Sequence, residues 1–89
     1  MKVHKVKIYE SYADAVLSGE KNFEIRNNDR GYQKGDQLKF YVTEDGSSFS
    51  SFHKTSHELF EKEYEITYVY SGVGMADGYV ALAIKPCRE

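Results

Sequence analysis

Cysteine, proline and tryptophan are scarce in this chain, which has one cysteine, one proline and no tryptophan among its 89 residues. Because Cys87 has no second cysteine to pair with, no internal disulfide can form, and the fold has to rest on its core, as in proteins of a reducing compartment. Long hydrophobic runs are lacking as well. The longest, residues 79–84, is far shorter than the roughly 20 residues that span a bilayer, and residues 1–5 lead into no signal stretch. We therefore expect a cytoplasmic domain that does not contact a membrane.

Positive charge is not in excess either. The formal net charge is −2, which argues against a protein that coats nucleic acid by bulk attraction. The charge is unevenly spread, however, because residues 1–39 carry a surplus of basic side chains and residues 40–89 a surplus of acidic ones. This asymmetry predicts a local basic surface on an acidic body, although chance and solubility would produce it equally well.

The first third of the chain reads as a strand followed by a short helix. Residues 3–9 alternate with the period of two that is typical of a half-buried strand. A helix of about two turns is predicted over residues 11–18. Ser11 and Asp14 resemble a capping box at its start, and Gly19 suits the left-handed position at its end.

Further strands are predicted at residues 21–26, 37–43, 63–71 and 79–85. Between them, residues 44–62 form an irregular loop or variable insertion, in which 56–62 could be a second helical turn or simply loop. Strands this short and numerous do not suit a βαβ sheet. We expect a single α+β domain, residues 1–89, built as a partly closed antiparallel or mixed β-barrel of about five strands.

The densest polar chemistry lies between residues 19 and 26. Alternate residues of a strand share a face, so Glu24 and Arg26 stand about 7 Å apart on one side of it, and Lys21 can project toward the same mouth through the turn. Arg and Lys bind phosphate or carboxylate, and Glu accepts hydrogen bonds. The alternative is a solvated strand face with an ion pair worth less than about 1 kcal/mol.

The same segment carries a family signature. Gly19-x-Lys21-x-x-Glu24-x-Arg26 resembles the G-x-K-x-x-E-x-R motif of the ASCH superfamily, and it lies in the expected helix-to-strand context. The resemblance covers most of the chain outside 44–62 and is closest to a small subgroup of uncharacterised bacterial and phage proteins. It extends over residues 12–18, 27–30, 34–38, 66–72 and 78–82. It implies a PUA-like barrel whose cleft, between helix and barrel, is lined by Lys21, Glu24 and Arg26 and binds RNA or a nucleotide.

Two other functions stay open. Some members of the family hydrolyse an acylated cytidine with a lysine, a threonine and a glutamate, and here Lys21 matches the lysine while Glu24 stands where the threonine would be. A metal-independent amidohydrolase of N4-acetylcytidine-like nucleosides would then need Glu24 as a general base on water. A protein-interaction domain is the other alternative, because Phe49 and Phe52 lie in a serine-rich stretch that could dock a partner.

Other residues extend or limit these hypotheses. Arg30 and Lys34 could continue a basic track from the cleft, or could be ordinary surface charges. Tyr70 and Ser71, at the end of a strand, could lie on the rim of the cleft, where an aromatic face would stack on a base.

No metal or cofactor is expected. His53 and His57 have a helical zinc spacing but no further ligands, so we expect two exposed loop histidines. Cys87 has no activating neighbour and is expected to be inert.

Overall fold

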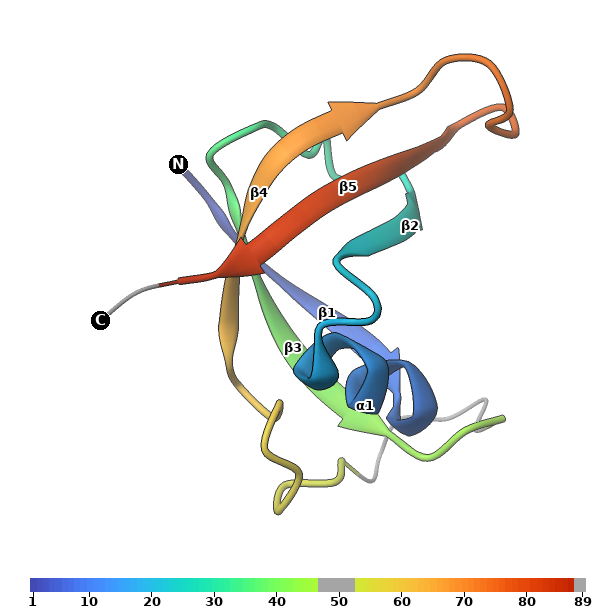
Figure 1. Ribbon diagram of the computed structural model, residues 1–89. Coiled ribbons are helices and arrows are strands. Elements are labelled where there is room, and N and C mark those ends of the chain that lie inside the picture. The colour runs from blue at the N-terminus through green and yellow to red at the C-terminus, as the bar shows by residue number, and fades with distance from the viewer. Residues whose placement is uncertain (47–52, 88–89) are drawn as a thin grey trace.

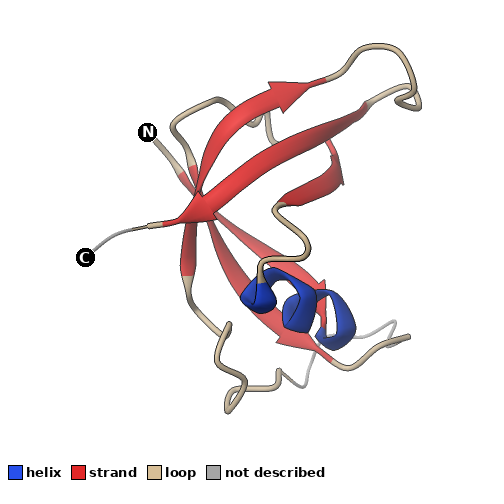
Figure 2. Ribbon diagram, viewed as in Figure 1, coloured by secondary structure: helices blue, strands red, loops and turns tan. Residues whose placement is uncertain are grey.

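The computed structural model describes residues 1–46 and 53–87 (Figure 1). Its elements in chain order are β1 (Val3–Tyr9), α1 (Glu10–Ser18), β2 (Phe23–Asn27), β3 (Gln37–Thr43), β4 (Glu63–Tyr70) and β5 (Tyr79–Pro86). The strands form one mixed sheet that curls into a half-barrel, with a short helix after the first strand (Figures 1 and 2). The predicted fold class is confirmed. Phe49 and Phe52 lie outside the described residues.

The sheet has the strand order β1-β3-β4-β5-β2. β1 pairs in parallel with β3, and every other neighbouring pair is antiparallel. Strands β1 and β2 are therefore the two edges of the sheet, although only helix α1 and a short turn separate them in sequence. Figure 2 shows the helix beside β1 and β3, next to the opening between the two edges.

The core is formed where alternating side chains of the strands meet the buried face of α1. Ala13 and Val16 of α1 are buried against it. Its largest fully buried side chains are Phe40, Leu38, Leu59, Ile66, Leu82, Val6 and Val42. Burying one such side chain stabilises a fold by about 1.5–3 kcal/mol, so the strand alternation read from the sequence is also the main source of stability.

Helix α1 begins without the predicted capping box, and that prediction is wrong. Tyr9 is the N-cap residue, with extended angles (φ −69°, ψ 149°) and no side-chain cap. Because the helix starts directly at the end of β1, Ser11 already lies inside the first turn, and its N–H donates to Asp45 Oδ1 at 3.0 Å. The end is as predicted: Gly19 is left-handed at φ 87°, and its N–H donates to the Val16 carbonyl at 3.2 Å.

Residues 53–62 form turns and no helix. Of the two predictions made for residues 56–62, a helical turn or a loop, the loop is therefore correct. This loop is tied to the domain through His57, which is not an exposed loop histidine as expected. Its side chain is 10% exposed, with Nε2 2.7 Å from Asp14 Oδ1, and Nδ1 accepts the Leu59 N–H at 3.1 Å. Because Nδ1 is an acceptor there, the proton lies on Nε2 and points at Asp14. The histidine thereby ties the loop to α1.

A β-bulge in β4 changes which face its tyrosines occupy. The alternation predicts Tyr68 on the same face as Tyr64 and Ile66, but the register shifts between Ile66 and Tyr68. After the shift Val69 stands opposite Leu82 and packs against the core, and Tyr68 is 61% exposed. A bulge inserts one extra residue and so reverses the faces beyond it.

The carboxylate of Asp36 fastens the N-terminus of β1 to the turn before β3. It is buried and accepts the Lys2 N–H at 3.0 Å, the Gln33 N–H at 3.2 Å and His4 Nε2 at 2.9 Å. Burial opposes ionisation of this carboxyl, but the His4, Lys2 and Gln33 hydrogen bonds together outweigh it and lower the pKa of Asp36 below its ordinary value of 3.8.

The lowered pKa makes Asp36 a source of acid sensitivity. Its contribution to the unfolding free energy is complete above the unfolded-state pKa near 3.8 and is lost as the pH falls through the lower folded-state pKa. We expect Asp36→Asn to be less stable than the parent in urea unfolding at about pH 6, and the difference to shrink at about pH 2.5. Asp29→Asn, an exposed turn substitution, is the control. An equal deficit at both pH values would contradict this account.

Candidate functional site

Strand β2 directs its polar side chains inward and its apolar ones outward. Phe23 is 41% and Ile25 56% exposed, whereas Glu24 is 5% exposed. The register explains this reversal: Glu24 stands opposite Leu82 of β5 and Arg26 opposite Val80, and both β5 residues are buried. Cross-strand partners share a face of a sheet, so Glu24 and Arg26 take the inward direction of their partners. A buried carboxylate at this place needs compensating charge.

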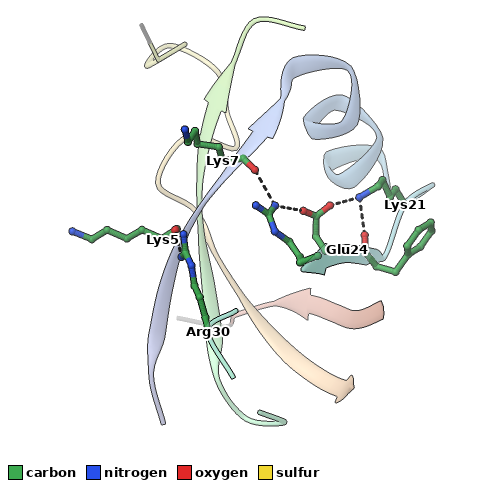
Figure 3. Close-up of polar contacts among 7 residues, drawn as sticks. Lys5, Lys7, Lys21, Glu24 and Arg30 are labelled. Atoms are coloured by element: carbon green, nitrogen blue, oxygen red, sulfur yellow. Dashed lines mark hydrogen bonds and ion pairs between the residues drawn. The ribbon is translucent and has the colours of Figure 1, made fainter. Parts of the chain in front are cut away.

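Two cations supply that compensation. The Lys21 ammonium contacts Glu24 Oε1, and Arg26 Nη1 lies 3.0 Å from Glu24 Oε2 (Figure 3). The side chains of Lys21 and Arg26 are 16% and 24% exposed. We call Lys21, Glu24 and Arg26 the charged triad. The sequence predicts that these three residues converge, and the structure brings them together.

Lys21 is held by the end of the helix and by two aromatic rings. Its backbone N–H donates to the Ala15 carbonyl at 3.0 Å, just after the left-handed Gly19. Its ammonium donates to the Phe23 carbonyl at 2.8 Å as well as to Glu24. The same nitrogen lies 5.5 Å from the centre of the Tyr12 ring and 5.0 Å from that of Phe23, within the range of cation–π attraction.

Arg26 also bridges the two edges of the sheet. Its Nη1 donates to the Lys7 carbonyl of β1 at 3.0 Å, and Arg30 donates to the Lys5 carbonyl further along the same strand (Figure 3). Two guanidinium groups thus cover alternate carbonyls on the free edge of β1. Unpaired edge carbonyls invite strand addition, so these arginines both close the half-barrel and protect its edge.

An open groove of about 1080 Å³ lies over the charged triad, between β1, β2 and α1. The exposed aromatic side chains Tyr9, Tyr12, Phe23 and Tyr79, which are 40% to 52% exposed, line it. The remaining lining residues are Lys7, Ile8, Ile25, Asn27 and Thr43. The side chain of Lys7 extends away from the triad (Figure 3). The groove therefore combines a charged floor with aromatic rims.

Three of the six residues predicted for the site lie outside this groove. The Arg30 guanidinium instead donates to the Lys5 carbonyl at the edge of β1. Tyr70 and Ser71 are not among the lining residues, and the Tyr70 hydroxyl donates to the Val73 carbonyl at 2.9 Å.

Sequence reasoning missed Tyr9, Tyr12 and Tyr79. Each lies at or near the end of a strand or the start of the helix, a position that could have suggested a rim, but only the strand order shows that the three meet.

The described residues hold no cluster of three or more histidine, cysteine or acidic side chains that could bind a metal. Burial, with the nearby Glu63 and Glu65, raises the pKa of the Cys87 thiol, which keeps it protonated and weakly nucleophilic. Helix α1, the one helix among the described residues, lacks the length and apolar character needed to cross a membrane.

Fold and site together define a half-barrel domain with a charged groove between its edge strands. The chain belongs to the family described as "Domain of unknown function (DUF3850)", whose family model matches residues 3–84. An uncharacterised 12.9 kDa protein in the GpA 3′ region of Escherichia phage P2 is 49% identical over 37 residues. That segment is 42% of this chain and 34% of the phage protein, so the chain spans about a third of this relative.

A crystal structure of hypothetical protein PH0355 is similar to this chain, with a TM-score of 0.57 and 18% identity. The similarity covers 98% of this chain and 100% of the other. At this level of identity it shows the shared fold alone.

Because Glu24 pairs with both cations of the triad, we expect its removal to lower the free energy of unfolding more than removal of any other side chain of the groove. Glu24→Ala would leave two partly buried cations facing one another, and we expect a loss of about 2–4 kcal/mol in the free energy of unfolding. Glu20→Ala, at an exposed position four residues earlier, should change it by less than about 0.5 kcal/mol. Urea unfolding measures both. Equal stabilities of the two variants would show that Glu24 is a solvated surface carboxylate.

Proposed function

We propose that the groove over the charged triad binds a nucleotide unit, either free or in single-stranded RNA. The observation that carries the proposal is the meeting of four exposed aromatic rings with the triad in one open groove. Exposed apolar side chains that cluster in one groove mark ligand-binding or interaction sites, and unpaired bases stack on aromatic faces at about 1–3 kcal/mol per base. A net charge of −2 suits a local site better than a surface that coats nucleic acid.

We further propose that the family is a branch of the ASCH superfamily of PUA-like domains. The support is the Gly19-x-Lys21-x-x-Glu24-x-Arg26 motif, which stands at the junction of α1 and β2. Gly19 ends the helix and the three charged residues meet at the groove. We also propose a cytoplasmic location, which suits a chain whose single cysteine forms no internal disulfide.

Tyr12 offers a direct test, because it is 52% exposed on the rim of the groove and lies on the helix surface. We expect Tyr12→Ala to weaken binding of a short single-stranded RNA by about 1–3 kcal/mol. Fluorescence anisotropy with a labelled mixed-sequence RNA measures this. Tyr68→Ala is the matched control, since Tyr68 is 61% exposed and lies outside the groove lining.

Arg26→Ala should weaken binding of the same RNA by about 1–3 kcal/mol. Lys62→Ala, at an exposed position, is its control. The proposal fails if Tyr12→Ala and Arg26→Ala bind as the unaltered protein does, or if Tyr68→Ala loses as much affinity as Tyr12→Ala.

One observation favours the hydrolase alternative, namely the contact between the Lys21 ammonium and the Glu24 carboxylate beneath a groove large enough to hold a nucleoside. Against it, both Glu24 oxygens already accept bonds from cations, so neither is poised to take a proton from water. We expect no release of acetate from N4-acetylcytidine above the buffer rate. Turnover that Glu24→Gln abolishes would establish hydrolysis in place of simple binding.

A further inference from the structure

We infer that the groove recognises the uncharged ring of a nucleobase through the outer edge of Arg26, and that the phosphate contributes little. The inference rests on the proposed function and narrows its ligand. Lys21 and Arg26 give the groove the appearance of a phosphate site, but the contacts that each cation already makes leave little of their charge for an anion.

Lys21 is engaged within the protein. An ammonium has three donor hydrogens, and this one contacts Glu24 Oε1 and the Phe23 carbonyl while it lies over the rings of Tyr12 and Phe23. Two of its three hydrogens go to protein oxygens, so Lys21 can offer a phosphate at most one donor unless it leaves the buried carboxylate that needs it. We therefore assign Lys21 the part of a fixed structural cation.

Arg26 retains N–H donors for a ligand, but they lie beside the negative charge of Glu24. Among the bonds of residues 1–46 and 53–87, it bonds through Nη1 alone, to Glu24 Oε2 and the Lys7 carbonyl, which leaves Nε and Nη2 for a ligand in the groove it lines. A phosphate placed there would approach the Glu24 carboxylate, and the Lys7 side chain extends away and adds no second cation (Figure 3). Like charges at short range disfavour such an arrangement.

A nucleobase can accept hydrogen bonds from the same Arg26 donors without bringing a second negative charge near the Glu24 carboxylate. Neighbouring oxygen and nitrogen acceptors on a base edge match two parallel N–H donors of a guanidinium, and the ring itself stacks on an aromatic rim. Four exposed rings line the groove, two of them already in contact with the Lys21 ammonium, against one arginine edge for polar contact. Stacking and bidentate hydrogen bonding should therefore supply most of the affinity.

The test compares each of the four ribonucleosides with its own 5′-monophosphate by NMR titration of the unaltered protein. We expect the tightest-binding nucleoside and its monophosphate to have dissociation constants within about threefold of each other. The affinity of the monophosphate should change by less than about twofold between roughly 50 and 150 mM salt, because one full phosphate contact alone would give about that change.

Arg26→Lys separates shape from charge. It keeps the positive charge but loses the planar fork, so we expect it to bind the nucleoside as weakly as Arg26→Ala does, with both folds checked by their NMR spectra. A monophosphate that binds more than about tenfold tighter than its nucleoside, with strong salt dependence, would overturn the inference and leave the proposed function intact. Rescue of nucleoside binding by Arg26→Lys would also overturn it. Binding of neither ligand would overturn the inference, and RNA that also fails to bind would overturn the proposed function itself.

Discussion

The buried carboxylate of Glu24 is the interaction on which the site depends. It stands opposite Leu82 in the register of β2 and β5 and therefore points inward, where a carboxylate without partners would be costly to bury. Lys21 and Arg26 satisfy it from either side, and Arg26 then reaches the free edge of β1. One acidic side chain thus fixes two cations and links the ends of the sheet, so that stability and site geometry have the same origin.

The half-barrel needs such a link because its two edge strands are not paired with each other. A closed barrel removes its edges through backbone hydrogen bonds. Here arginine side chains cover two carbonyls of β1 instead, from Arg26 and Arg30. A seam held by side chains leaves room for a groove, and this groove lies next to α1 with aromatic rims. The incomplete closure of the barrel is what makes the site possible.

Much of this could be predicted from the sequence. Period-two alternation located five strands, and Gly19 marked the end of the helix correctly. The spacing of Lys21, Glu24 and Arg26 predicted their convergence, because strand geometry is local. The predictions that failed concerned contacts between distant parts of the sequence, or depended on one extra residue in a strand. The bulge in β4 reversed the face of Tyr68, and the contact of His57 with Asp14 joins residues that the strand pattern does not relate. The tyrosines of the groove come together only through the order of the strands.

The most direct test of the account is a map of backbone amide shifts in ¹⁵N-labelled protein during titration with a short single-stranded RNA. The account predicts that the largest changes fall on Tyr9, Tyr12, residues 23–27 and Tyr79, which surround the groove. Changes that centre instead on the turn between β4 and β5, at residues 71–78, with β2 unaffected, would contradict it.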